Sequence, residues 1–317
     1  MTLRRFVLTI SLVALAACGS EDEASLSCHD DSPVVAMNRN QPDFEGGAQV
    51  ITISGRDEVR VISGDWVATE PSFDPSGRLL VVSRADGDYE SAGPGSASLW
   101  ILDIAEGSSR KLTHGRYDRD PDWSPDGGTI AYSHLTGRGS GQLTVVDADG
   151  SEPRTLLPDR FDAYAPAWSP DSDRIAFVRA ERQSDLSSRT SVWLVDSDGT
   201  DVELLADIDR ARSVEWSPDG ESLLVTTLGA ERGGMTIVDV DDGKADVVAD
   251  GAALGAWSAD GDRIYYDANE SVVSGPDTWR PAVGRLEDGR LHRDRFLGDA
   301  TDYYLYPYFG LTVGPCG

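Results

Sequence analysis

The stretch Asp120-Pro121-Asp122-Trp123-Ser124-Pro125-Asp126-Gly127, followed by an apolar run at 129–132, decides the fold. Proline presets φ at the second position of a tight turn, aspartate tolerates the third, and glycine closes it, so this stretch predicts a hairpin. An aromatic residue followed by a turn of this kind occurs five times, beginning at Phe73, Trp123, Trp168, Trp216 and Trp257. The spacings of 50, 45, 48 and 41 residues are typical of propeller blades or solenoid units.

Each repeat has the same order of parts: an aromatic strand, a tight turn, an apolar strand, a long variable loop, and two further strands joined by a second turn. This order predicts a four-stranded antiparallel blade. The second strands are almost entirely apolar, as expected when neighbouring blades cover both of their faces. They occupy residues 79–82, 130–132, 175–178, 223–225 and 264–266.

The two ends of the chain are expected to share one blade. The segment 34–62 contains three strand patterns but no aromatic first strand, whereas Pro307-Tyr308-Phe309 matches the proline and aromatic residue of the other repeats. We therefore expect residues 305–313 to supply the innermost strand of the first blade. Counting this blade predicts an all-β, six-bladed propeller of four-stranded antiparallel blades over residues 32–317, closed by the C-terminal strand.

The first 31 residues have the pattern of an export signal and a tether. Arg4 and Arg5 precede an apolar run that is too short to cross a bilayer, so residues 1–17 are predicted to be a signal peptide. The run ends in Leu15-Ala16-Ala17-Cys18, which resembles the bacterial lipobox, although an ordinary secretory signal is the alternative. Lipidation of Cys18, by palmitate for example, and a flexible tether over 18–31 would anchor the protein in the envelope.

Cys28 and Cys316 lie near the two ends of the predicted propeller. In an exported, oxidising location such a pair predicts a disulfide bond. This bond would enclose nearly the whole folded chain and lock the ring.

The chain is strongly acidic, with 55 aspartate and glutamate residues against 28 lysine and arginine residues and a formal net charge of -27. Repulsion from phosphates argues against a nucleic-acid partner. The acidic surface favours solubility or a salt-tolerant source, and a dedicated surface for basic ligands is the alternative.

The residues 120–127 with 129–133, and Pro166-Ala167-Trp168-Ser169-Pro170-Asp171 with 174–177, closely resemble the TolB-type propeller repeat. The resemblance covers about residues 32–315. It implies the propeller fold, but the same repeat occurs in TolB, in the propeller domains of prolyl peptidases and in many other exported proteins. TolB has an additional N-terminal α/β domain, which we do not expect here, and it lacks a lipid anchor.

Binding residues are expected on the face that carries the long loops, because variable loops on a rigid scaffold are the usual place for function. Arginine and tyrosine are frequent in binding hot spots. Each such residue could instead serve in salt bridges and packing between loops. The candidate partner-binding residues are Arg116, Tyr117, Arg119, Arg160, Tyr164, Arg210, Arg212, Tyr303 and Tyr304.

No catalytic motif is found: Gly-x-Ser-x-Gly is absent, the repeated serines lie in turns, and the four histidines lack metal-ligand spacing. We therefore expect no catalytic residue, metal ion or cofactor. The first hypothesis is a monomeric, non-catalytic scaffold, anchored by N-terminal acyl chains at the periplasmic face of the outer membrane or the cell surface. It would bind an unknown envelope protein or peptide through its loop-rich face.

The alternative is an envelope hydrolase or lyase that acts on carbohydrate or peptide at the channel mouth. A deep pocket with converging carboxylates or histidines would favour the enzyme, and a broad surface of tyrosine and arginine would favour the scaffold.

Overall fold

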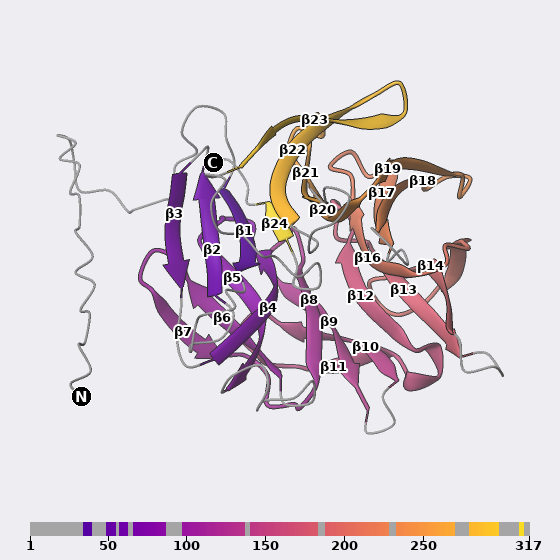
Figure 1. Ribbon diagram of the computed structural model, residues 1–317. Helices are drawn as coiled ribbons and strands as arrows, with labels where there is room; N and C mark the ends of the chain where they lie inside the picture. Colours follow the sequence, from indigo (N-terminus) through magenta and orange to yellow (C-terminus); the bar gives the residue numbers. More distant parts are fainter. Residues whose placement is uncertain are drawn as a thin grey trace, which may run out of the picture.

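Four-stranded antiparallel sheets arranged around a common axis make up the protein (Figure 1). The structure, a computed structural model, describes residues 34–39, 49–54, 57–62, 66–86, 97–136, 140–182, 188–227, 233–269, 279–297 and 311–313. For the first three of these segments and the last one, only the backbone is described.

Five of the sheets are blades, each built from one continuous repeat with its four strands in chain order. The blades consist of β4 (Trp66–Phe73), β5 (Leu79–Asp86), β6 (Ser98–Asp103) and β7 (Ser108–Lys111); β8 (Asp118–Trp123), β9 (Thr129–Leu135), β10 (Gly141–Asp147) and β11 (Arg154–Leu157); β12 (Ala163–Trp168), β13 (Arg174–Arg182), β14 (Ser188–Asp196) and β15 (Glu203–Ala206); β16 (Ala211–Trp216), β17 (Ser222–Thr227), β18 (Gly234–Asp239) and β19 (Ala245–Asp250); and β20 (Ala252–Trp257), β21 (Ile264–Asn269), β22 (Trp279–Glu287) and β23 (Arg290–Phe296). The first strand of each blade contacts the first strand of the next, so β4, β8, β12, β16 and β20 lie innermost.

A further sheet joins the two ends of the chain. Its strands are β1 (Val34–Arg39), β2 (Gln49–Ser54), β3 (Asp57–Ile62) and β24 (Leu311–Val313), in the order β24-β1-β2-β3. Val35 pairs with Val313, and β24 contacts both β20 and β4.

The prediction of an all-β propeller is confirmed, but the prediction of six near-identical blades is wrong. The repeat builds five four-stranded blades, and the sheet shared by the chain ends is of another kind. The physical reason is its connectivity: β24 and β1 come from opposite ends of the chain, so no signature hairpin joins them, and the described part of its inner strand has three residues.

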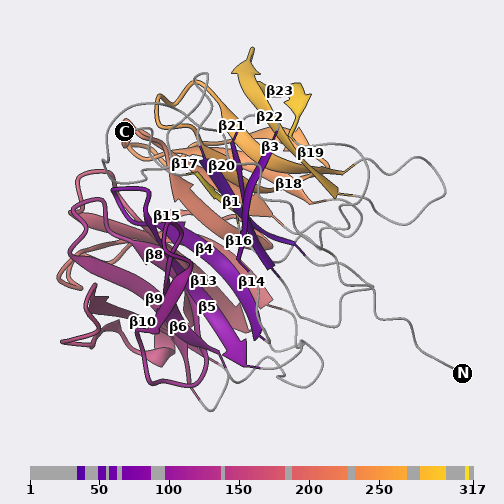
Figure 2. The same ribbon diagram turned by 90° about the vertical axis from the view of Figure 1, so that its left-hand side faces the viewer.

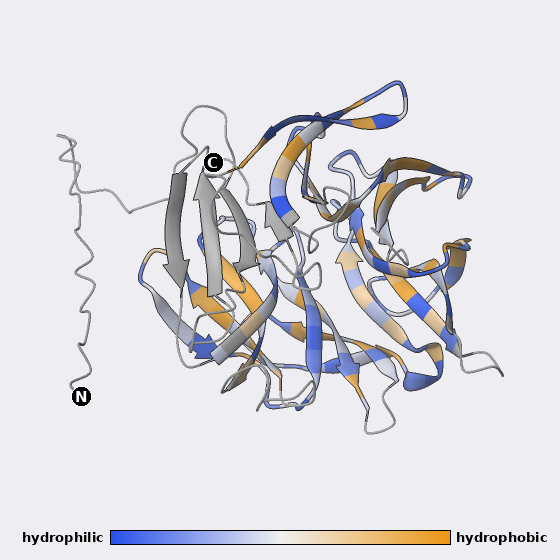
Figure 3. Ribbon diagram, in the orientation of Figure 1, coloured by the Kyte–Doolittle hydropathy of each residue, from blue (hydrophilic) through white to orange (hydrophobic). Residues whose placement is uncertain are grey.

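The second strands of the blades lie in the core, as predicted. Leu80, Val81 and Val82 of β5 have no exposed surface, and neither have the residues Ile175 and Phe177 of β13. The outer strand β7 is exposed along its whole length. In Figure 3 the middle strand β5 is coloured largely hydrophobic and the innermost strand β8 largely hydrophilic, and Figure 2 shows β4 and β5 running side by side in one blade. Burial between neighbouring sheets therefore stabilises the array.

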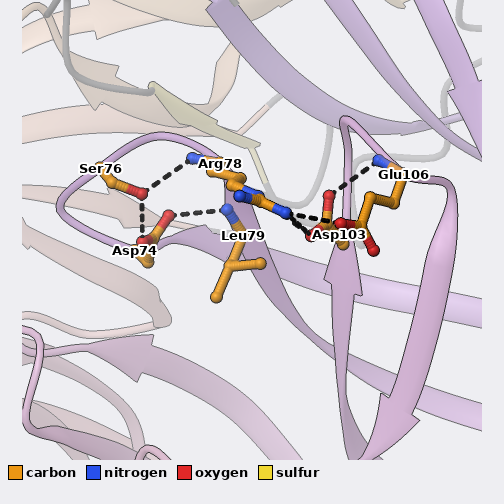
Figure 4. A network of polar contacts seen from close by, with 6 residues as sticks. All are labelled: Asp74, Ser76, Arg78, Leu79, Asp103 and Glu106. Atoms are coloured by element: carbon orange, nitrogen blue, oxygen red, sulfur yellow. Dashed lines mark hydrogen bonds and ion pairs between the residues drawn. The ribbon is translucent and has the colours of Figure 1, made fainter. Parts of the chain in front are cut away.

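The signature hairpins hold themselves together. In four of them the serine hydroxyl donates to the aspartate two residues later and accepts a backbone N–H, as Ser217 does with Asp219 at 2.6 Å and Ser222 at 2.9 Å. The first hairpin has the two residue types exchanged (Figure 4): Ser76 Oγ donates to Asp74 at 2.5 Å, and Asp74 accepts the N–H of Leu79 at 2.7 Å. These side chains are therefore structural, as predicted for the repeated serines.

The described part of the chain contains a single helical turn, Asp159–Phe161, between β11 and β12. No helix within the described segments is long and apolar enough to cross a bilayer. Residues 1–33, including the predicted signal peptide and Cys18, lie outside the described segments, as do Cys28 and Cys316.

Candidate functional site

A cavity of about 520 Å³ lies on the axis, lined by the innermost strands and by the hairpins that follow them. Its rim carries four exposed hairpin prolines, Pro75, Pro125, Pro170 and Pro218. Because these prolines are in contact with solvent, the cavity opens on the face of the short hairpins. The charged residues of its described wall are Glu70, Asp74, Asp120, Asp122, Arg212 and Glu215.

A β-bulge interrupts every innermost strand of the five blades. It lies two to three residues before the aromatic residue in four of them and at Arg212, four residues before Trp216, in β16. In four of them the bulge contains a residue with left-handed backbone, at Glu70 (φ 56°), Asp120 (φ 49°), Ala165 (φ 48°) and Leu254 (φ 50°). A left-handed conformation costs a residue other than glycine about 1–2 kcal/mol. Bulges change the direction in which a side chain points, and here two of the four positions carry carboxylates that line the cavity.

Arg212 joins two of the wall carboxylates across blades. Its guanidinium lies 3.6 Å from Glu70 Oε1 and 3.6 Å from Asp120 Oδ1. Glu70 Oε2 also accepts the backbone N–H of Asp120 at 2.8 Å, and Asp120 Oδ2 that of Ala165 at 3.4 Å. Burial raises the pKa of Glu70 to about 8, the charge of Asp120 adds to the rise, and Arg212 opposes it. The contacts of Glu70 and Asp120 therefore link the blades that begin with β4, β8 and β12, and Arg212 of β16 adds the next blade to this group.

The residue immediately before the aromatic residue makes a second set of links. Asp122 Oδ2 accepts the backbone N–H of Trp168 at 2.7 Å, and Glu215 Oε1 accepts that of Trp257 at 3.1 Å. Ser72 does the same for Trp123 at 3.0 Å. Each of these acceptors belongs to one blade and each donor to the next. These side chains therefore connect neighbouring blades.

Burial also raises the pKa values of the two acidic residues in this second set, Asp122 and Glu215. It raises the pKa of Asp122 to about 6, against the effect of hydrogen bonds from Trp168 and Ser72. It raises the pKa of Glu215 well above the usual range, and the charge of Asp122 contributes to that rise.

Three of the predicted binding residues gather beside this cluster. Arg212 is part of it, and the positive charge of Arg119 lowers the pKa of Glu70. Tyr164 donates its hydroxyl to the carbonyl oxygen of Ala211 at 3.3 Å, and burial raises its pKa to about 12. The structure thus brings Arg119, Tyr164 and Arg212 together, in contacts between blades.

The other predicted residues lie apart from the cavity. Arg116, Arg160 and Arg210 are exposed in the connections between blades, each in a different one. Tyr117 is half-buried with φ at 78°, and its backbone N–H donates to the carbonyl of Ala97 at 2.8 Å. Tyr303 and Tyr304 lie outside the described residues.

A buried aspartate and a partly exposed histidine form a pair at the loop-rich face. Asp118 accepts from Thr113 Oγ1 at 2.5 Å and lies 2.7 Å from His134 Nδ1. The Asp118 side chain is 1% exposed and that of His134 34%. Such a carboxylate orients an imidazole and leaves its other nitrogen facing outward. Within the described segments, no group of three or more histidine, cysteine, aspartate or glutamate side chains is placed to hold a metal ion.

Four acidic residues of the innermost strands line the cavity without having been predicted from the sequence: Glu70, Asp120, Asp122 and Glu215. A usable signal was present, since each of these acidic residues stands one or three positions before the repeat aromatic. The repeat hides it, because these carboxylates resemble the surface aspartates of the adjoining turns.

Known proteins with similar sequences match parts of the chain. An uncharacterized protein of Agrobacterium fabrum is 35% identical over 133 residues, 39% of this chain and 44% of that protein. The Tol-Pal system protein TolB of Alcanivorax borkumensis is 29% identical over 157 residues, 48% of this chain and 29% of that protein. An uncharacterized peptidase of Bacillus subtilis is 31% identical over 108 residues, 34% of this chain and 16% of the peptidase. The matches span less than half the length of these relatives, and no family model matches the chain.

Solved structures share the architecture over most of the chain. TolB of Acinetobacter baumannii superimposes with a TM-score of 0.65 at 13% identity, covering 89% of this chain and 67% of that one. A putative TolB of Agrobacterium tumefaciens gives 0.60 at 19% identity, covering 84% and 90%. At these identities the structural match establishes the propeller fold. The chain is a β-propeller whose repeat is similar to that of proteins named TolB.

Proposed function

We propose that this propeller is a non-catalytic scaffold of the cell envelope that binds a protein or peptide through its loop-rich face. One observation carries the proposal: the carboxylates that converge on the cavity in the innermost strands accept backbone N–H groups of the following blade. Glu70, Asp120, Asp122 and Glu215 all do so. Groups held in this way maintain the ring, which favours a structural role over acid–base catalysis.

The loop-rich face supplies what a binding surface needs. Arg116, Arg160 and Arg210 are exposed there at three successive blade connections. Arginine offers five N–H donors and a flat apolar surface, and is enriched in binding hot spots. Their positive charge on a strongly acidic protein favours a partner with carboxylates at matching positions.

We also propose where in the cell envelope this protein is located. Export by residues 1–17, acylation of Cys18 and a tether over 18–31 would hold the propeller, proposed to extend over 32–317, at the periplasmic face of the outer membrane or at the cell surface. A disulfide between Cys28 and Cys316 would tie the ends. Relatives named TolB support an envelope location, since their printed name places them in the Tol-Pal system.

The test compares two charge reversals of equal size. The loop-face variant replaces Arg116, Arg160 and Arg210 by glutamate, and the control replaces the exposed outer-strand residues Arg110, Arg154 and Arg290 by glutamate. Proteins crosslinked in native membranes are identified by mass spectrometry. We expect a partner that the wild type and the control capture and the loop-face variant loses. Equal capture by all three proteins would refute the assignment of the face.

An enzyme is the second candidate, favoured by the Asp118–His134 pair and by the peptidase of Bacillus subtilis among the relatives. The pair would act as an oriented general base on a substrate bound at the loop-rich face. Hydrolysis of envelope peptides or glycans by the purified protein, abolished in His134→Ala, would establish this reading. Equal turnover by the wild type and His134→Ala would dismiss it.

A further inference from the structure

The outer strand of the last blade differs from the other outer strands in its length and its charge. β23 has seven residues, whereas β7, β11 and β15 have four each and β19 has six. Its sequence contains Arg290, Arg293 and Arg295 against one acidic residue, Asp294. The chain as a whole carries a formal net charge of -27. The edge of this blade is therefore a local positive region on an acidic protein.

This strand also has an open edge. β23 is the last strand in the order β20-β21-β22-β23, and no described strand pairs with its outer side. Arg290, His292 and Arg293 are exposed, and Figure 1 shows the hairpin of β22 and β23 projecting from the ring. An edge strand presents backbone N–H and C=O groups with which another chain can pair. The length of β23 is sufficient for such pairing, since strands commonly have about five or six residues.

Two arginines of β23 have no anion in the described structure. The acidic residue Asp294 already lies 3.0 Å from Arg285, and Arg290 and Arg293 take part in none of the described ion pairs. The guanidinium of Arg293 lies 4.0 Å from the centroid of the Phe296 ring. Such a contact holds the guanidinium in place, while its N–H donors stay available for a carboxylate. Both arginines can therefore accept an acidic side chain from outside.

Charge selects what can pair with this edge. A second copy of the chain would bring the same arginines to the edge, and like charges on paired strands are destabilising. A wide anionic surface, such as a membrane or a nucleic acid, would also meet Glu287 and Asp288, which are exposed at the tip of the same hairpin. A single extended acidic segment can contact the arginines without covering the tip, so it is the occupant that the charges favour.

We propose that the outer edge of β23 binds an extended acidic segment of another protein, which pairs with the backbone as a fifth strand of this blade. Arg290 and Arg293 are three positions apart in a regularly paired part of β23, so they lie on opposite faces of the sheet. An added strand that passes both arginines matches them with acidic side chains that are also three positions apart. This surface is separate from the loop-rich face and goes beyond the function proposed above.

Fluorescence anisotropy with labelled heptapeptides tests the charge and its spacing. The first peptide is Thr-Glu-Val-Thr-Glu-Val-Thr, the second has glutamine in place of both glutamates, and the third is Thr-Glu-Val-Glu-Thr-Val-Thr, which has the composition of the first. We expect saturable binding of the first peptide and at least tenfold weaker binding of the second. The third should bind at least threefold more weakly than the first, because its carboxylates lie on one face. Equal binding of the first two peptides would overturn the proposal.

Two further versions of the first peptide test the strand pairing. One has an N-methyl group on the first valine and the other has it on the threonine that follows. Neighbouring N–H groups of a strand point to opposite sides, so one methyl group would face β23 and the other would face solvent. We expect one version to lose at least tenfold in affinity and the other to bind like the unmodified peptide. Equal binding of the two versions would contradict backbone pairing.

Variants assign the surface to its residues. Arg290→Gln combined with Arg293→Gln should weaken binding of the first peptide at least tenfold, and urea unfolding verifies that the fold is kept. The matched control, Arg110→Gln combined with Arg154→Gln, removes two exposed charges from β7 and β11 and should bind like the wild type. The triple control of the loop-face test lacks Arg290, so it should lose this peptide while it keeps the loop-face partner. Unchanged affinity in the β23 variant, or binding of anionic phospholipid vesicles in place of the peptide, would overturn the proposal.

Discussion

Replacing Asp267 by asparagine is expected to stabilise the protein at neutral and alkaline pH. Asp267 lies in β21 and is 3% exposed, and its Oδ1 has no hydrogen-bond partner among the described residues. Its pairing partner in β22 is Pro281, which has no N–H to donate. Burial raises the pKa of Asp267 from 3.8 to about 7. The folded protein therefore favours the protonated form.

The sign and size of this gain in stability follow from the linkage between protonation of Asp267 and folding. A carboxyl whose pKa is raised on folding costs no stability below the unfolded pKa, and the full cost is reached once the pH exceeds the folded pKa. At about 1.4 kcal/mol per unit, a shift of about three units corresponds to a cost of about 4 kcal/mol at pH 8 and about 2 kcal/mol at pH 5. Asparagine removes the charge but keeps a buried amide, so these are upper bounds on the gain.

The assay is urea unfolding at pH 5 and pH 8 of the wild type, Asp267→Asn and the control Asp262→Asn, an exposed residue of the same blade. We expect the gain from Asp267→Asn to be about 2 kcal/mol larger at pH 8 than at pH 5. The control should show no such difference. A gain that is independent of pH, or a loss at pH 8, would refute the reasoning.

Replacing Arg212 by methionine is expected to cost about 3 kcal/mol in urea unfolding, because it leaves two carboxyls without their cation. The loss should be larger at pH 9 than at pH 6, since the pKa of Glu70 is raised to about 8, and an equal loss at both would contradict the cluster. Asp74→Ala should lower stability by about 1 kcal/mol in thermal unfolding, whereas the exchange Asp74→Ser with Ser76→Asp should be neutral within about 0.5 kcal/mol; a costly exchange would show that the two hairpin forms are not equivalent. Cys18→Ala should move the protein from the membrane to the soluble fraction, and unchanged fractionation would exclude the lipid anchor.

The repeat made the blades predictable from sequence. Proline and aspartate before Gly127 specify the turn through local backbone preferences, and the apolar run that follows requires burial on both faces. Both signals act over fewer than ten residues, so they survive in each copy. The predicted number of blades was wrong because the sheet shared by the chain ends was counted as a blade. That sheet is formed by segments without the signature hairpin, so no local pattern describes it.

The candidate site was only partly predictable. Arg116, Arg160 and Arg210 lie in blade connections, and their part in partner binding stays a prediction. Arg212 was expected on the binding surface too, yet the bulge in β16 places it against Glu70 and Asp120 of two other blades. Those contacts span well over fifty residues of chain, and a position in one repeat does not reveal which side chain of another repeat it meets. The loop-rich face was also expected to carry the channel mouth, whereas the cavity opens at the hairpins.

The central claim is that the cavity carboxylates join neighbouring blades, which supports the structural role proposed for them. Amide hydrogen exchange at Trp168 tests it most directly, because this N–H donates to Asp122 at 2.7 Å. In Asp122→Ala we predict that the Trp168 amide loses its protection by at least tenfold, while the amide of Trp257, which donates to Glu215 at 3.1 Å, keeps its protection. Unchanged protection at Trp168 would contradict the claim.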